Sequence, residues 1–96
     1  MGFLRDKLVT KIGTHTIEVR GDNHVLRGLI YKLLIDGEEV ASEQNFWKLP
    51  TKRRLEAQID INGTQKNIVV LVKQQILSAD FSMMLDSEPI QLKRVE

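Results

Sequence analysis

The feature that most constrains the fold of this chain is a strict alternation of apolar and polar residues that stops at an Asn-Gly pair. Over residues 54–61 every second position is apolar: Leu55, Ala57, Ile59 and Ile61. Successive side chains of a β-strand point to opposite faces of the sheet, so this pattern predicts a strand with one buried face. Asn62-Gly63 predicts a type I′ hairpin turn, because both central positions of that turn need positive φ. The returning strand, residues 65–73, carries apolar side chains on both faces, which is typical of a central strand.

Three further segments repeat the same hairpin plan. Their expected strand pairs are residues 7–12 with 15–20, residues 29–35 with 38–44, and residues 79–85 with a final strand through Ile90 and Leu92. The turns between them are expected at Gly13-Thr14, Asp36-Gly37 and Asp86-Ser87. Pro89 has no N–H to donate, so it places the last strand at a sheet edge. Four sequential hairpins predict an all-β fold, an eight-stranded antiparallel β-sandwich that occupies residues 1–96 as one domain.

The same alternation selects the residues of the core. We expect the sandwich to enclose Leu8, Ile17, Val19, Tyr31, Leu33, Ile35, Leu55, Ile59, Ile61, Ile68, Val70, Val72, Phe81, Met83, Ile90 and Leu92. Val40 is also expected to face inward. Two segments interrupt the strands: residues 21–24, interpreted as a turn-rich loop, and residues 45–52, a longer loop. Loops vary while the sheets keep their shape, so we expect function in these two segments.

The residues that catalysis and metal binding need are sparse. The chain has no cysteine, which excludes disulfides, thiol catalysis and a cysteine zinc site. His15 and His24 match neither the HxH nor the HExxH spacing of metal sites, so we interpret them as solvated or capping histidines. The serines lie outside any GxSxG motif, and the glycines form no phosphate-binding loop. The sequence therefore predicts a protein that is not an enzyme and that has no metal site and no cofactor.

The candidate interaction residues are aromatic and basic, and they lie in and just after the longer loop: Phe46, Trp47, Lys48, Lys52, Arg53 and Arg54. One interpretation is that the aromatic pair stacks on nucleic-acid bases while the cations neutralise phosphates. The other is that Trp47 or Phe46 fills the core between the sheets, with the cations at its rim. The formal net charge of +1 favours the second, since phosphate neutralisation supplies much of the affinity for nucleic acid.

Apolar residues also occupy positions that face away from the predicted core. Ile30 and Leu34 share the outer face of one strand, and Val69 and Leu71 share that of another. Without a second layer over them, they would form an exposed patch that binds a partner or a second copy of the chain. Unpaired sheet edges offer another route to a homodimer.

Signals for membranes or secretion are weak in this sequence. The longest apolar run is residues 68–72, whereas a membrane-spanning helix needs about 20 residues. The first residues contain no apolar stretch of the length found in a secretory signal. We therefore expect a cytoplasmic protein that does not associate with membranes.

Four segments together resemble a known family: GTHTIEV at residues 13–19, YKLLIDGEE at residues 31–39, EQNFWKL at residues 43–49 and ING at residues 61–63. The chain resembles the Fas apoptotic inhibitory molecule family over residues 13–92. The resemblance implies an eight-stranded antiparallel sandwich without a catalytic site, which acts through protein–protein contacts in survival signalling and in limiting protein aggregation. The chain departs from the family pattern because it holds one such unit where the animal proteins hold two, and because it lacks further tryptophans.

We therefore expect a non-enzymatic protein-interaction module of the Fas apoptotic inhibitory molecule-like type, which binds a protein partner or a second copy of itself. The alternative is a small β domain that binds single-stranded nucleic acid through the aromatic-basic loop, residues 46–54. A hollow barrel that carries a lipid or another small ligand is compatible with the many Ile, Val and Leu residues but is not indicated by them.

Overall fold

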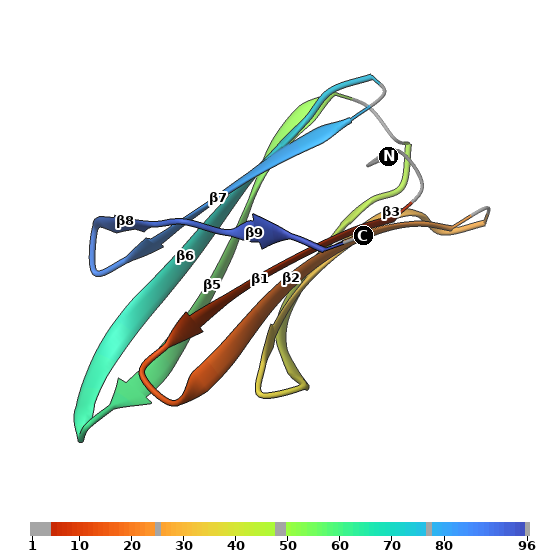
Figure 1. Cartoon of the computed structure of the whole chain (residues 1–96). Helices are drawn as coiled ribbons and strands as arrows, with labels where there is room; N and C mark the ends of the chain where they lie inside the picture. The colour runs from red at the N-terminus through yellow and green to blue at the C-terminus, as the bar shows by residue number, and fades with distance from the viewer. Residues whose placement is uncertain (1–4, 25, 48–49, 77, 96) are drawn as a thin grey trace.

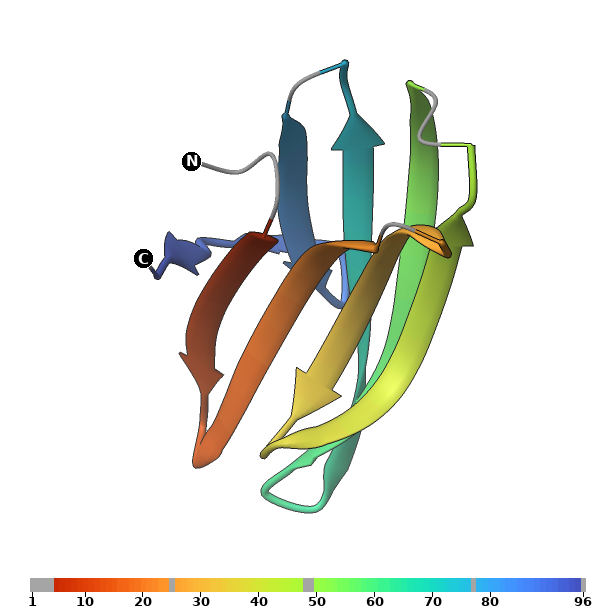
Figure 2. The ribbon, with the colours of Figure 1, turned by 90° about the vertical axis from the view of Figure 1, so that its right-hand side faces the viewer.

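The strands form two antiparallel sheets that pack face to face (Figures 1 and 2). The computed structural model describes residues 5–24, 26–47, 50–76 and 78–95. One sheet has the strand order β4-β3-β2-β1-β9 and the other has β5-β6-β7-β8. The strands are β1 (Arg5–Ile12), β2 (His15–His24), β3 (Gly28–Ile35), β4 (Glu38–Asn45), β5 (Thr51–Ile61), β6 (Thr64–Gln74), β7 (Ala79–Leu85), β8 (Glu88–Ile90) and β9 (Lys93–Arg94). No residue in the described ranges is helical, so the predicted all-β sandwich of sequential hairpins is confirmed.

Because each sheet is built mainly from consecutive antiparallel strands, the connections fall into two groups. The tight turns at residues 13–14, 36–37, 62–63 and 86–87 point to one end of the sandwich, which we call the turn end. The connections β2–β3, β4–β5 and β6–β7 point to the opposite end, which we call the loop end. In Figure 2 the β6–β7 and β4–β5 connections of the loop end lie uppermost, and the β2–β3 connection lies below them.

The hairpin turns have the backbone geometry that their sequences predict. Asn62 has a φ of 54° and Gly63 a φ of 83°, as a type I′ turn requires. Asp36 and Gly37 repeat this pattern with φ values of 52° and 83°. Asn and Asp tolerate positive φ better than most residues, so these dipeptides select the turn and thereby the register of the strands on either side.

The core lies between the sheets and contains the residues that the alternation selects. Fully enclosed members are Ile17, Val19, Tyr31, Leu33, Leu55, Ile59, Ile68, Val70, Val72 and Met83. Leu8 is also buried, and the other predicted members pack against the core while partly buried: Ile35, Ile61, Phe81, Ile90 and Leu92. The expectation for Val40 is wrong. Leu33 pairs with Ala41 and Leu34 pairs with Glu39, so Val40 is the extra residue of a β-bulge and is exposed.

Residues 21–24 are strand rather than the predicted loop. They continue β2, and they pair with β3 as far as His24 opposite Gly28. Gly21 lies close to the other sheet: a Cβ at this position would lie 3.1 Å from the ring of Phe81, so a larger residue would require that ring to shift.

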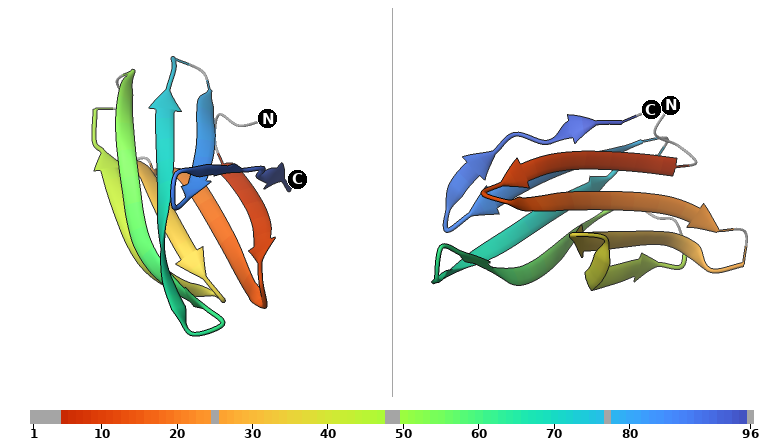
Figure 3. Two further views of the ribbon diagram at one scale, coloured as in Figure 1. Left: turned by 90° about the vertical axis from the view of Figure 1, so that its left-hand side faces the viewer. Right: turned by 60° about the horizontal axis from the view of Figure 1, so that its bottom comes forward.

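The C-terminal segment adds a strand that the sequence pattern does not reveal. After β8 the chain crosses to the first sheet, where β9 lies along the edge of β1 (Figure 3, right). The Val95 N–H donates to the Lys7 carbonyl at 2.7 Å, and Arg94 forms an ion pair with Asp6. β9 thus covers part of a sheet edge that would otherwise present unpaired backbone groups.

The predicted outer-face patch is mostly absent. Ile30 and Leu34 are buried although they face away from the core. Leu34 pairs with Glu18 on β2 and with Glu39 on β4, so the longer side chains of these two glutamates lie on either side of it. Val69 is also largely buried, whereas Leu71 is 40% exposed. The prediction of an exposed patch is therefore wrong for the first sheet and holds at Leu71 on the second.

Candidate interaction surface

Four exposed apolar side chains belong to connections at the loop end of the sandwich. We call the following residues the loop-end cluster: Leu26 at 84% exposure, Phe46 at 53%, Trp47 at 75% and Ile76 at 78%. Leu26 belongs to the β2–β3 connection, Phe46 and Trp47 to the β4–β5 connection, and Ile76 to the β6–β7 connection. The fold therefore brings large apolar groups from three separate parts of the sequence to one end of the molecule.

The β2–β3 and β4–β5 connections are held tightly against each other. Gly28 has a φ of 81°, and a Cβ at this position would lie 2.5 Å from the Phe46 Cα and from the Phe46 carbonyl oxygen. Only glycine combines this backbone conformation with so close an approach. The Gln44 side-chain amide also donates to the Arg27 carbonyl at 2.5 Å. These contacts fix the backbone of Phe46 beside the connection that carries Leu26.

The aromatic pair lies outside the core. The rings of Phe46 and Trp47 meet edge to face, with centroids 5.0 Å apart and an interplanar angle of 90°. The interpretation that one of them fills the space between the sheets is wrong. Tyr31 and Phe81 fill that space from opposite sheets, with ring centroids 6.3 Å apart. Because these rings already occupy the interior near Gly21, Trp47 remains available at the surface.

A buried hydrogen-bond network supports the β6–β7 connection. The Tyr31 hydroxyl donates to the Gln74 side-chain oxygen at 2.5 Å. The Gln74 amide group in turn donates to the carbonyls of Gln75 and Ser78, at 2.7 and 3.0 Å. Burial raises the pKa of the Tyr31 hydroxyl, although a hydrogen bond with Asn45 opposes this effect. The network holds in place the connection that presents Ile76.

The predicted basic residues do not form a single patch. Lys52, Arg53 and Arg54 belong to β5 rather than to the preceding loop, so their side chains alternate between the two faces of the sheet. Arg53 is half-buried and lies 3.9 Å from Glu43. Arg54 donates from Nε to Glu56 at 2.8 Å. Lys48, the remaining cation of the predicted set, lies outside the described residues.

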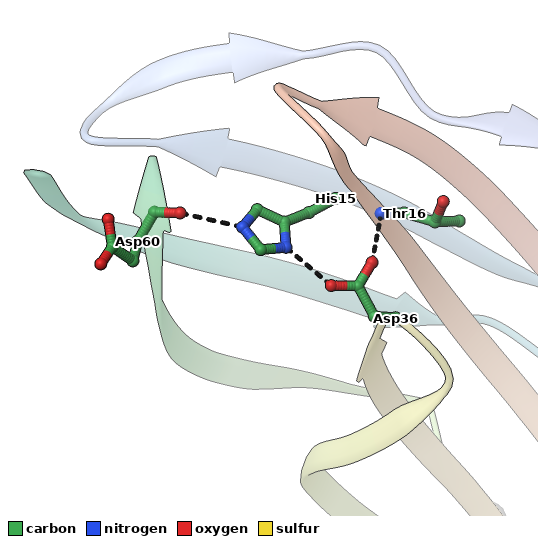
Figure 4. Close-up of polar contacts among 4 residues, drawn as sticks. All are labelled: His15, Thr16, Asp36 and Asp60. Carbon is green, nitrogen blue, oxygen red and sulfur yellow. Dashed lines mark hydrogen bonds and ion pairs between the residues drawn. The ribbon is translucent and has the colours of Figure 1, made fainter. Parts of the chain in front are cut away.

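A second polar arrangement joins the two sheets at the turn end (Figure 4). His15 Nδ1 lies 2.7 Å from the Asp36 carboxylate, and His15 Nε2 lies 2.9 Å from the Asp60 carbonyl oxygen. Both partners are acceptors, so the ring satisfies both only when each nitrogen carries a proton. The hydrogen bond to Asp36 raises the pKa of His15, and the same contact lowers the pKa of Asp36. Sequence reasoning missed this role, because Asp36 and Asp60 are distant in the chain.

The histidines do not share a site. His15 begins β2 at the turn end and His24 ends the same strand at the loop end. Among the described residues, no three His, Cys, Asp or Glu side chains cluster as metal ligands would. The described part of the chain also contains no helix with the length and apolar character needed to cross a membrane.

No family model, curated protein or solved structure matches this chain. The resemblance to the Fas apoptotic inhibitory molecule family therefore stays a prediction.

Proposed function

We propose that this chain is a non-enzymatic interaction module that binds a protein partner through the loop-end cluster. The observation that carries the proposal is the exposure of Leu26, Phe46, Trp47 and Ile76, each more than half exposed, at one end of the sandwich. Large apolar groups left exposed are a feature of protein-binding surfaces, and Phe46 and Trp47 form a pair in direct contact. Tryptophan is also one of the residue types enriched among those that dominate binding energy in protein interfaces.

The rigidity of the loop end supports the same proposal. Gly28 fixes the backbone next to Phe46, and Gln74 fixes the connection that carries Ile76. A surface that is ordered before binding loses less conformational entropy when a partner docks. On the resemblance described above, we propose that the module is of the Fas apoptotic inhibitory molecule-like type, with a second copy of the chain as one candidate partner. The weak membrane and secretion signals of the sequence support a cytoplasmic location.

Site-specific photo-crosslinking tests this proposal. A benzoylphenylalanine replaces Trp47 in one variant, Ile76 in a second and Thr14, at the turn end, in a matched control. We expect the same partner, or a second copy of the chain, to be crosslinked from positions 47 and 76 and not from position 14. Equal crosslinking from all three positions, or none from the loop-end positions, would overturn the proposal.

The alternative, single-stranded nucleic acid, uses the exposed rings of Phe46 and Trp47 as a stacking platform. Two of the cations that it requires, Arg53 and Arg54, already pair with glutamates of the same chain, which favours a protein partner. Titration of Trp47 fluorescence with oligothymidylate at about 50 mM salt separates the two proposals. Quenching that saturates and weakens steeply with salt would replace the protein partner with nucleic acid.

A further inference from the structure

The outer face of β5, β6 and β7 lies in front in Figure 3 (left). A groove of about 320 Å³ is lined by residues that include Lys52, Leu71, Lys73 and Ser82. A second hollow of about 550 Å³ is lined by residues that include Pro50, Lys73 and Ile76. Lys73 lines both hollows, and we call the surface from Leu71 past Lys73 to Ile76 the track.

Two lysines face each other across the middle of this track. Lys52 pairs in register with Lys73 on the neighbouring antiparallel strand, which places both side chains on the same face. Like charges at directly opposed positions destabilise a sheet. Neither lysine has an ion-pair partner among the described residues, whereas Lys66 on the same strand lies 3.8 Å from Asp86. Asp80, opposite Lys73 on the next strand, also lines the groove, and its carboxylate accepts a hydrogen bond from the Gln75 side-chain amide at 3.2 Å.

Leu71 supplies an apolar surface beside the two lysines. It is 40% exposed and lies two residues before Lys73 on the same face of β6. That spacing corresponds to about 6.8 Å along a strand. The track therefore presents, in order, an apolar group, a pair of cations and the apolar residues Pro50 and Ile76.

We infer that this track binds an extended peptide segment of a partner protein, whose acidic side chain lies between Lys52 and Lys73 and whose large apolar side chain, two positions away, lies on Leu71. The inference deepens the proposed function, since it names the chemistry of the partner. The charge of the bound carboxylate offsets the repulsion between the two lysines, and the apolar side chain removes the exposed part of Leu71 from water.

Titration of the ¹⁵N-labelled chain with an acetylated and amidated peptide, Ser-Leu-Ser-Glu-Ser-Ser-Phe-Ser, tests this inference. We expect saturable shifts of the amide signals of Lys52, Leu71 and Lys73, and none at Gly37 on the turn end. The same peptide with Gln in place of Glu should bind several-fold more weakly. Unchanged affinity for the Gln peptide, or shifts spread evenly over the chain, would overturn the inference.

Charge reversal provides the sharper arm of the experiment. The double variant Lys52→Glu with Lys73→Glu should bind the Glu peptide at least about tenfold more weakly and should regain binding to a peptide with Lys in place of Glu. Lys11→Glu, an exposed lysine on β1 of the other sheet, is the matched control and should leave the affinity unchanged. A double variant that binds both peptides like the unmodified chain would refute the site.

Stability measurements separate a binding role from a structural one. Lys52→Gln removes the opposed like charges and leaves Lys73 beside Asp80, so it should raise the melting temperature while it weakens peptide binding. A Lys52→Gln variant that lowers both stability and affinity would show that Lys52 supports the fold and would contradict the inference.

The outcomes for the two proposals remain distinct. Crosslinking from Trp47 and Ile76, together with a lysine pair that has no effect on peptide binding, would leave the proposed function standing and remove this inference. If oligothymidylate displaces the bound labelled peptide at a lower concentration than the unlabelled peptide does, the track binds nucleic acid and both proposals are overturned.

Discussion

The ion pair between Asp6 of β1 and Arg94 of β9 provides a direct test of how the C-terminal strand stabilises the fold. Asp6 lies in the row of β1 side chains that faces the core, and it is 4% exposed. Its partner Arg94 belongs to the short strand β9 and keeps 43% of its side chain exposed. Burial raises the pKa of Asp6, and the guanidinium of Arg94 opposes this rise. Replacing Arg94 with alanine leaves a buried carboxylate without its cation.

The size of the effect follows from the burial of the two partners. Removing one partner of a fully buried pair costs about 3–5 kcal/mol, whereas a surface pair contributes about 0–1 kcal/mol. Because Arg94 is partly exposed, we expect Arg94→Ala to lower the free energy of unfolding by about 1–2 kcal/mol at neutral pH. With a urea dependence of about 1 kcal/mol per molar, the midpoint of unfolding should fall by roughly 1–2 M.

The pH dependence gives the sign of the effect. Since the pKa of Asp6 in the folded chain lies above its ordinary value of 3.8, protonation of Asp6 favours the folded state. That stabilisation is fully present below about pH 4 and is lost as the pH rises through the folded pKa. Without Arg94 the pKa should rise further, so the loss caused by Arg94→Ala should be greatest at pH 7 and should shrink in acid.

Urea unfolding, followed by circular dichroism at pH 7 and at a pH below about 4, measures the free energy of unfolding of each variant. Adding Asp6→Asn to Arg94→Ala removes the unpaired charge, so the double variant should recover most of the lost stability at neutral pH. An equal loss at neutral and acidic pH, or a double variant no more stable than Arg94→Ala, would refute the argument from a buried charge.

Three further predictions concern the two ends of the sandwich. The raised pKa of His15 implies a stabilisation of the folded state that is fully present below about pH 6.5 and is lost as the pH rises through the folded pKa. His15→Gln should abolish this pH dependence of stability, and NMR titration of the ring should give a pKa above 6.5. Gly28→Ala should lower the free energy of unfolding by more than about 2 kcal/mol, because its Cβ would meet backbone atoms. Gly37→Ala, with open space around the new Cβ, should lower it by about 1 kcal/mol. Equal losses in urea unfolding would contradict the packing argument. Trp47→Ser should change stability by less than about 0.5 kcal/mol, and iodide should quench Trp47 emission readily in the free chain; a protected, blue-shifted emission would place the ring in the core instead.

Local sequence patterns predict the hairpins because the signals act over a few residues. The alternation through Leu55 and Ile59 selects the buried face, and Asn62-Gly63 selects the turn. The errors arise where distant segments decide the outcome. Val40 follows the alternation but lies in a bulge set by its pairing with β3. Gly21 suggests a loop in the sequence, but in the structure it lies in β2. A Cβ at this position would come within 3.1 Å of the Phe81 ring from the other sheet.

The candidate surface was predictable in part for the same reason. Phe46 and Trp47 are identified by composition, but the sequence does not decide whether they or Tyr31 and Phe81 lie between the sheets. Leu26 and Ile76 carry no sequence signal, since single apolar residues in short connections are common. Their location at the same end as Trp47 becomes apparent only from the meander topology.

The arrangement of the sheet edges favours the proposed binding at the loop end over pairing of strands. β4 is bulged and carries glutamates, β8 is three residues long and contains Pro89, and β9 lies over part of β1. Bulges, charges, proline and short strands are the features by which edges avoid pairing with other chains. The fourth edge, β5, lies beside β4 of the other sheet (Figure 2). A dimer formed through an edge would have to displace one of these features, whereas a partner at Leu26, Trp47 and Ile76 displaces none. Deletion of β9 should therefore promote self-association without altering crosslinking from position 47.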